Sequence, residues 1–228
     1  MNVFTSIGPP SRPSRRLPRM KKISESTVRR LSLYLRFLQE AADRGLDTIS
    51  SDDLAERGGT TSAQVRKDLS FFGSFGKRGL GYSVPELVGR IREILGLDHS
   101  WRVALVGAGK IGSALFSYRD FQRRGFHIQA VFDSDPAKVG AAWGDLRVRH
   151  DQEMDRAIRE DGIDIVIVAV PAEAAQSVVD RVVGAGVRAI LNFAPTRLRV
   201  PESVALRYVD MTVELEGLAY AISGERLR

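Results

Sequence analysis

The 228 residues predict an α/β chain in two parts, a small helical part followed by a doubly wound parallel sheet. Two observations predict this order. Up to about residue 72, apolar residues recur at helical spacing, and a glycine-rich segment follows. From residue 101 onward, short apolar runs alternate with helical patterns, which is typical of a parallel sheet covered by helices.

Three short helices are predicted in the first part. The first has Ser24 as its N-cap, and the second covers Asp52–Arg57 after a serine- and aspartate-rich start. The third covers Ser62–Phe72, where the order of residues fits a capping box with the Thr61 hydroxyl bound to the amide of Gln64.

The segment Gly73–Tyr82 is too rich in glycine for a helix and suits a tight β-hairpin. Three helices followed by a hairpin are the order of a winged helix-turn-helix, in which the third helix enters the major groove of DNA. The alternative is a solvated face on a dimerisation module. The side chains expected to face DNA lie on the third helix (Gln64, Arg66, Lys67 and Ser70) and at the hairpin tip (Lys77 and Arg78).

The net charge of +6 does not by itself indicate a nucleic-acid partner, because residues 1–22 carry six basic side chains and no acid. The other 28 basic residues are balanced by 28 acidic ones. A local excess remains: between residues 64 and 78 there are four basic side chains and one acid, Asp68. The DNA-binding prediction rests on this local patch.

Residues 1–22 are rich in proline, serine and arginine and are expected to be disordered. They are a dispensable tail, an over-extended start with Met20 as the first residue, or an arm that tracks phosphates. The expected divisions of the chain are a basic arm (1–22), a winged-helix domain (23–86), a linking helix (87–100), a Rossmann-type NAD(H)-binding domain (101–210) and a C-terminal dimerisation helix (211–228).

The glycine motif Gly107–Gly112 lies between a predicted strand, Trp101–Val106, and a predicted helix, Ile111–Arg123. Its first glycine permits a tight turn, its second lets the backbone approach a pyrophosphate, and its third lets helix and strand pack closely. Asp133 ends the next strand, where a carboxylate accepts hydrogen bonds from ribose hydroxyls and repels a 2′-phosphate. NAD(H) is therefore favoured over NADP(H).

Two later segments, Val170-Pro171 and Asn192-Phe193-Ala194-Pro195, end predicted strands at the carboxyl edge of the sheet, where ligands bind. They are candidates for the nicotinamide end, although each is equally a loop shaped by proline. The chain closes with a predicted amphipathic helix at about 212–222. The expected cofactor-binding residues are Gly107, Ala108, Gly109, Lys110, Ile111, Gly112, Asp133, Val170, Pro171, Asn192 and Phe193.

Catalysis is not expected. Hydride transfer needs a group that manages the substrate proton, yet neither His127 nor His150 stands in a recognisable catalytic pair, and no second lobe encloses a substrate. No metal site is expected either, because the chain has no cysteine and its three histidines are scattered. No apolar run is long enough for a membrane span and no signal peptide is evident, so a cytoplasmic protein is expected.

Two rival functions remain. One is a small NAD-dependent oxidoreductase with a helical dimerisation domain. The other is a DNA-binding protein that senses coenzyme A or an adenine nucleotide, since a glycine-rich turn does not by itself require nicotinamide. The position of Asp133 argues against a phosphorylated ribose such as that of coenzyme A.

The chain also resembles the Rex family of bacterial redox-sensing transcriptional repressors from about Ile23 to its end. The resemblance is carried by the segments 34–36, 64–70, 73–79, 107–112, 132–133, 170–176 and 192–195. It implies a homodimer with an exchanged C-terminal helix that binds inverted-repeat operators when NADH is scarce. NADH would close the dimer and release DNA, with NAD⁺ as a weaker competitor.

The resemblance further implies a polar set that rearranges with the redox state of the cofactor. The matching positions carry Arg36, Tyr118 and Asp210. All three residue types are present, so the switch is expected to work in this chain.

Overall fold

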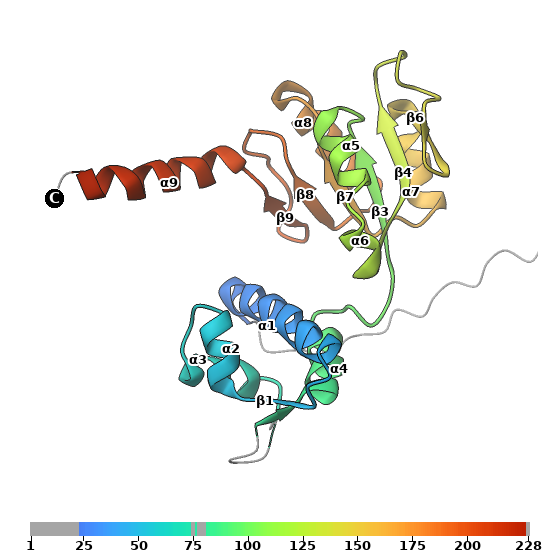
Figure 1. The fold of residues 1–228 in the computed structure, drawn as a ribbon. Helices are drawn as coiled ribbons and strands as arrows, with labels where there is room; N and C mark the ends of the chain where they lie inside the picture. The colour runs from blue at the N-terminus through green and yellow to red at the C-terminus, as the bar shows by residue number, and fades with distance from the viewer. Residues whose placement is uncertain (1–22, 74–75, 77–80, 227–228) are drawn as a thin grey trace, which may run out of the picture. The chain divides into compact units, whose positions relative to one another are not determined.

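A computed structural model describes residues 23–73, 76 and 81–226, and divides into two compact units between Asp98 and His99 (Figure 1). The first unit holds the predicted DNA-reading helices and the second holds the predicted sheet. Each unit is described by itself.

The first unit is a small helical bundle with a two-stranded ribbon. Its elements are α1 (Glu25–Asp43), β1 (Thr48–Ile49), α2 (Ser51–Arg57), α3 (Ser62–Ser70), β2 (Tyr82–Ser83) and α4 (Val84–Ile94). The predicted caps form: the Ser24 hydroxyl accepts from the amide of Thr27, and Ser50 and Asp53 make a reciprocal capping box at α2.

Apolar side chains at helical spacing fill the core of this unit. Leu31, Leu35 and Leu38 of α1 are buried, as are Leu87 and Ile91 of α4, which packs along α1. Helix α4, expected as part of a linker, is therefore part of the first unit's core.

The predicted hairpin falls mostly outside the described residues. Of its segment, Tyr82 pairs with Ile49 in the antiparallel ribbon of β1 and β2. Helix α3 ends at Ser70, two residues before the predicted end, and Gly73 has a φ of 133° that L side chains rarely adopt.

The second unit is a seven-stranded sheet in the order β5-β6-β4-β3-β7-β8-β9, parallel throughout except for the edge strand β5 (Figure 1). The strands are β3 (Trp101–Val106), β4 (Phe126–Asp133), β5 (Ala142–Trp143), β6 (Leu146–His150), β7 (Ile165–Val168), β8 (Ala189–Asn192) and β9 (Ala205–Tyr208). The helices are α5 (Lys110–Phe116), α6 (Asp120–Arg123), α7 (Met154–Glu160), α8 (Ala172–Gly184) and α9 (Met211–Arg226), with the 3₁₀ turn η1 (Asp151–Glu153).

The order reverses between β3 and β7, and ligands bind at such a switch point in open α/β sheets. Alternate residues of β3 point to opposite faces, with Ala104 and Val106 in one buried cluster and Val103 and Leu105 in the other. The sheet is thus buried on both faces, as the apolar runs predicted.

The helix predicted at Ile111–Arg123 is wrong in one respect, because the structure divides it into α5 and α6. Helix α5 ends where the Ser117 hydroxyl donates to the carbonyl of Ser113. Ser117 keeps its backbone bond to Ser113, and the α-helical pattern ends at Tyr118, whose N–H bonds three residues back to Leu115.

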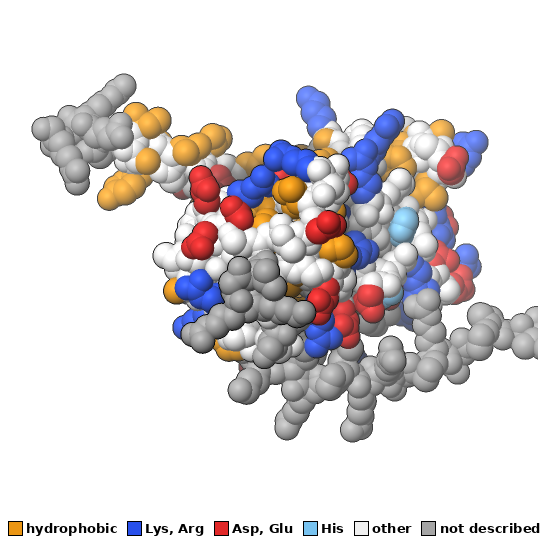
Figure 2. Space-filling view, turned by 60° about the horizontal axis from the view of Figure 1, so that its bottom comes forward, with side chains coloured by type: hydrophobic (Ala, Val, Ile, Leu, Met, Phe, Trp, Pro, Cys, Tyr) orange, Lys and Arg blue, Asp and Glu red, His pale blue; other side chains and the backbone are white. Residues whose placement is uncertain are grey.

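Helix α9 leaves the sheet after β9 without packing on it (Figure 1). Its large apolar side chains are all exposed: Met211, Val213, Leu215, Leu218, Tyr220 and Ile222. Figure 2 shows them as orange atoms along the projecting helix at the upper left. An apolar helix this exposed indicates a protein partner. In the described part of the chain, no helix is long and apolar enough to cross a bilayer.

Candidate functional site

The glycine loop after β3 has a shape that side chains would block. Gly107 has a φ of 105°, and a Cβ there would collide with the carbonyl oxygen of Ala169. A Cβ on Gly112 would collide with the carbonyl of Gly107. Gly109 faces open space, which suits a backbone that a ligand approaches. The geometry at Gly107 and Gly112 fits the tight turn and the close packing that the motif predicts, and Gly109 leaves the approach to the loop open.

A cavity of about 780 Å³ lies beside this loop, at the carboxyl ends of the central strands. Most of the predicted cofactor residues line it: Gly107, Gly109, Lys110, Ile111, Asp133, Val170, Pro171 and Phe193. Ala108 lies along a shallower neighbouring hollow, and Gly112 is buried under the loop. A volume of this size is typical of small-molecule and cofactor sites.

Asn192 is placed differently from the other predicted residues. Its side chain is fully buried, donates to the carbonyl of Ala194 and accepts from the amide of Ala194. It thereby fixes the turn that brings Phe193 and Pro195 to the cavity.

Asp133 is held at the edge of the cavity by three donors. Its Oδ2 accepts from the backbone N–H of Ala108 at 2.7 Å and from Lys138 Nζ at 3.2 Å, and its Oδ1 accepts from the N–H of Asp135 at 2.8 Å. Burial disfavours the charged form, but these donors outweigh it and lower the pKa of Asp133. The side chain is an ionised acceptor, and the three donors leave about one of its four lone-pair positions for a ribose hydroxyl.

Sequence reasoning missed two basic residues of this cavity, Lys138 and Arg181. Lys138 pairs with Asp133 across the turn after β4. Arg181, on α8, binds Asp151 and Asp155 from η1 and α7. The spacing of Lys138 from Asp133 was a usable signal, whereas the partners of Arg181 are 26 and 30 residues away and only the fold unites them.

On α3 the predicted DNA-reading side chains divide into two groups. Arg66, Lys67 and Ser70 are exposed on one face. Arg66 Nη1 donates to the Ser51 hydroxyl at 2.9 Å, which ties this face to α2. The predicted wing-tip residues Lys77 and Arg78 lie outside the described residues.

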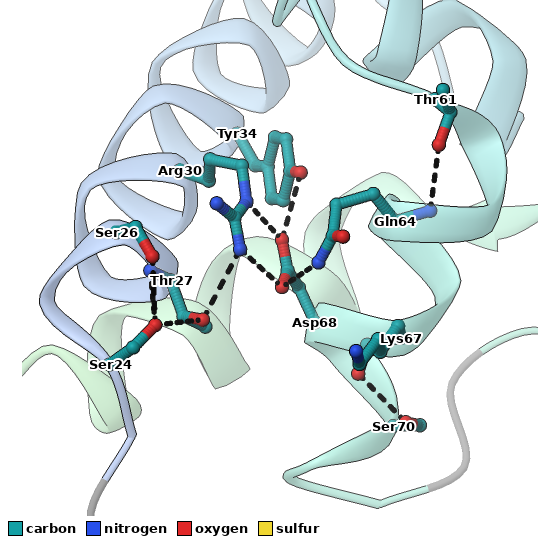
Figure 3. Close-up of polar contacts among 10 residues, drawn as sticks. All are labelled: Ser24, Ser26, Thr27, Arg30, Tyr34, Thr61, Gln64, Lys67, Asp68 and Ser70. Atoms are coloured by element: carbon teal, nitrogen blue, oxygen red, sulfur yellow. Dashed lines mark hydrogen bonds and ion pairs between the residues drawn. The ribbon is translucent and has the colours of Figure 1, made fainter.

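Gln64 belongs to a second group, centred on the buried carboxylate of Asp68 (Figure 3). Arg30 of α1 binds Asp68 through two nitrogens, at 2.6 and 2.8 Å, and Tyr34 Oη donates at 3.1 Å. Gln64 Nε2 donates to the same carboxylate at 2.8 Å. Asp68 is thus an internal brace between α1 and α3, and it contributes little negative charge to the patch.

The proposed capping box at α3 is only half formed. The Thr61 hydroxyl accepts from the amide of Gln64 as expected. The Gln64 side chain turns to Asp68 instead of returning to Thr61. The prediction was wrong here because a bond to an ionised carboxylate is stronger than one to a neutral backbone group.

The three expected switch residues occupy exposed positions. Arg36 lies on the outer face of α1. Tyr118, between α5 and α6, is about half exposed and stacks edge-on against Phe121 with ring centroids 5.1 Å apart. Asp210 Oδ1 accepts from the amide of Thr212 and so begins α9. Among the residues that the structure describes, no cluster suited to a metal ion occurs.

Two family models match the chain, one in each unit. Residues 22–70 match the model described as "Putative DNA-binding protein N-terminus". Residues 98–196 match the model of a CoA binding domain. The first model lies within the first unit, and the second begins where the structure divides, near residue 98.

Curated relatives match almost the whole chain. The redox-sensing transcriptional repressor Rex of Carboxydothermus hydrogenoformans is 50% identical over 201 residues, which is 88% of this chain and 97% of that protein. The Rex protein of Streptomyces coelicolor is 48% identical over 202 residues, 89% of this chain and 78% of that protein.

Solved structures match at the level of the fold. RSP, a Rex-family repressor, in complex with NAD⁺ and operator DNA has a TM-score of 0.87 and 37% identity, and covers 91% of this chain and 95% of that one. RSP in complex with NADH has a TM-score of 0.83 and 36% identity, and the match covers 91% of this chain and 97% of that one. With a braced recognition helix and a glycine-loop cavity in one chain, and relatives at this identity and coverage, the chain belongs to the Rex family of redox-sensing transcriptional repressors.

Proposed function

We propose that this chain is a transcriptional repressor that binds an inverted-repeat operator as a homodimer and leaves the DNA when NADH binds. One observation carries this proposal: RSP, which aligns with 91% of the chain, has been solved both with NADH and with NAD⁺ and operator DNA. In each alignment the matched region includes both a DNA-binding and a dinucleotide-binding part. A repressor of bacterial operators acts in the cytoplasm, where the chromosome lies.

The proposed cofactor is NAD(H), held by the cavity beside the glycine loop. The motif from Gly107 to Gly112 would approach the pyrophosphate, and Asp133 would accept from the adenine ribose. An ionised Asp133 supports NAD(H) over NADP(H) and over coenzyme A, whose ribose carries a phosphate. The match to the model of a CoA binding domain fits the fold of this unit, and the position of Asp133 favours NAD(H) as its ligand.

NADH would bind more tightly than NAD⁺. The proposed nicotinamide end is lined by Val170, Pro171 and Phe193. The reduced ring is neutral and enters an apolar site at low cost, whereas the oxidised ring is a cation that needs compensation. The ligand then shifts the DNA-competent population by its differential affinity for the two dimer states.

The DNA-binding surface would consist of the exposed face of α3 and the wing. Arg66, Lys67 and Ser70 supply donors on one face of a helix whose other side is buried at Val65 and Leu69. Gln64 lies at the border of the two sides. We include Lys77 and Arg78 at the wing tip in this surface.

The domain functions follow from this assignment. Residues 23–86 would read DNA, with 87–98 completing the core of the same unit, 101–210 would hold the cofactor, and 211–228 would dimerise, with 1–22 as a basic arm. The exposed apolar side chains of α9, among them Leu215, Leu218 and Ile222, support exchange of this helix with a second copy.

The switch would involve Arg36, Tyr118 and Asp210. Asp210→Ala should leave DNA binding intact but raise the NADH concentration that releases DNA by at least about tenfold. Glu214→Ala, which removes a charge from the first turn of α9, is the matched control. Release by Asp210→Ala at the wild-type NADH concentration would remove Asp210 from the switch.

The decisive experiment is fluorescence anisotropy of a labelled inverted-repeat duplex with the full chain, titrated separately with NADH and NAD⁺. Release at much lower NADH than NAD⁺ is expected. An operator affinity that neither NADH nor NAD⁺ changes would contradict the redox response. Turnover of an alcohol or aldehyde with NAD⁺ would instead favour the oxidoreductase, which membership in a family of regulators argues against.

A further inference from the structure

The side-chain amide of Gln64 is held in one orientation by the buried carboxylate of Asp68. An ionised carboxylate has about four lone-pair positions. Four donors reach Asp68: Nη2 of Arg30 and Nε2 of Gln64 at Oδ1, and Nε of Arg30 and Oη of Tyr34 at Oδ2 (Figure 3). The carboxylate is fully buried, and these donors occupy all of its lone-pair positions.

The ionised Asp68 carboxylate accepts hydrogen bonds and has no proton to donate. Burial alone would favour its protonated form, but donation from Arg30 and Gln64 lowers the pKa of Asp68. A reversed Gln64 amide would place its Oε1 against Oδ1 at hydrogen-bond distance with no proton between them. The usual freedom of a glutamine amide to turn over is therefore removed at this position.

Because Nε2 points inward, the Oε1 oxygen of Gln64 is left as an acceptor. It accepts no hydrogen bond from any residue in the described ranges 23–73, 76 and 81–226. Gln64 is half-buried in the first turn of α3, next to the exposed Ala63 and close to the exposed Lys67. The N-terminal residues of a recognition helix are those that reach base edges.

We propose that Gln64 determines operator specificity by presenting Oε1 to the exocyclic amine of one adenine or cytosine in each half-site, and that Asp68 is the positioning residue that prevents the amide from turning. In the major groove adenine and cytosine offer an amine donor, whereas thymine and guanine offer only acceptors. A free glutamine would accommodate either kind; the braced one rejects thymine and guanine. This inference rests on the proposed DNA-binding function.

The test uses an inverted-repeat duplex that the full-length protein selects from a random pool. Each adenine is replaced in turn by purine and each cytosine by 2-pyrimidinone, which removes only the exocyclic amine. At one position per half-site, the loss should be about tenfold for the wild type and below about twofold for Gln64→Met. The comparison between the two proteins cancels the effect of the analogue on the duplex itself.

Equal losses for wild type and Gln64→Met at every position would overturn the role of Gln64. The carbonyls are tested in the same way, with 2-aminopurine in place of each guanine and 5-methyl-2-pyrimidinone in place of each thymine. A loss there that Gln64→Met abolishes would overturn the proposed polarity. If no duplex is selected at all, the proposed DNA-binding function itself fails. A selected duplex without Gln64 coupling overturns only the present inference.

The positioning role of Asp68 has its own test. In Asp68→Asn the new amide can donate as well as accept, so Gln64 is free to turn and should discriminate little between amine and carbonyl at its position. Tyr34→Phe is the matched control, because it removes a donor from Oδ2 and leaves the bond between Gln64 and Oδ1. Tyr34→Phe should keep wild-type discrimination.

A merely structural Asp68 would weaken binding uniformly across all base pairs in both variants, and that result would overturn the positioning role. Hydrogen exchange of α3 in Asp68→Asn reports whether the helix is still formed. If it is not, Asp68→Glu serves as the second variant, since it keeps the acceptor charge and should restore discrimination at the same base pair.

Discussion

Asp68 and Asp133 are both carboxylates with lowered pKa values, but they differ in what holds them. Asp68 is bound by side chains of two helices, with donors 34 and 38 residues away in the sequence. Asp133 is bound mainly by backbone N–H groups of Ala108 and Asp135 in the loops beside it. A carboxylate whose lone-pair positions are all taken by side chains braces a structure, whereas Asp133, held mainly by backbone at the edge of the cavity, keeps about one position for a ligand.

Because Asp68 and Asp133 are held differently, replacing each of them by alanine should have a different consequence. Loss of Asp68 should affect the fold of the first unit and loss of Asp133 should affect a ligand. The predictions below test this contrast, beginning with the largest effect.

Asp68→Ala should destabilise α3 by about 3 kcal/mol, because it leaves the Arg30 charge and the buried Tyr34 hydroxyl without their partner. The measurement is hydrogen exchange of α1 and α3 amides in the full chain. Since the folded pKa is lowered, the wild-type advantage is present above the ordinary carboxyl pKa of 3.8 and is lost as pH falls below it.

Asp53→Ala, at the exposed capping box of α2, is the control for Asp68→Ala and should cost only about 1 kcal/mol. Similar exchange rates in the two variants would mean that the buried brace contributes no more than a surface cap.

Asp133→Ala should weaken NADH binding roughly tenfold to a hundredfold, since hydrogen bonds to a charged group contribute about 1.5–3 kcal/mol. Binding is measured by calorimetry. Asp161→Ala, an exposed and ion-paired aspartate outside this cavity, is the matched control and should change affinity little. Operator affinity without NADH should be unchanged in Asp133→Ala; a parallel loss of DNA binding would show that Asp133 braces the structure as Asp68 does.

Arg66→Ala and Lys67→Ala should each weaken operator binding roughly tenfold and leave NADH affinity unchanged. If the side chain contacts phosphate, the slope of log binding constant against log salt concentration should also become shallower by about one unit. Arg156→Ala on α7 removes the same charge from an exposed site in the second unit and serves as control. Equal losses in Arg156→Ala would indicate a general charge effect.

Tyr34→Phe should cost about 1 kcal/mol of stability at neutral pH, the usual contribution of one hydrogen bond. Burial and the neighbouring Asp68 carboxylate raise the pKa of Tyr34 to about 12, from an ordinary value of 10.0. The wild-type advantage is therefore complete below pH 10 and disappears as pH rises towards 12. Thermal unfolding across this range checks it; parallel curves for wild type and variant would remove Tyr34 from the brace.

Local chemistry explains why most of the fold was predictable. The strand Trp101–Val106 is found as predicted because its apolar run Val103–Val106 is buried on both faces of the sheet. Ser24, Ser50 and Thr61 cap their helices because their hydroxyls reach amides three residues ahead. The break after Ser117 was not predicted, since the apolar periodicity continues through it and only the backbone bond of Tyr118, to Leu115, departs from the α-helical pattern.

The sequence alone determined the two-part organisation, the glycine loop, the position of Asp133 and the basic face of α3, because each depends on neighbours in the chain. Only the tertiary structure decided that Asp68 is buried and that the Gln64 side chain donates to it instead of returning to the helix cap at Thr61. It also decided which distant residues bind Arg181. The physical reason is the same in each case. The desolvation cost of a buried charge is offset only where donors from separate elements meet, and the spacing of residues in the sequence does not show where they meet.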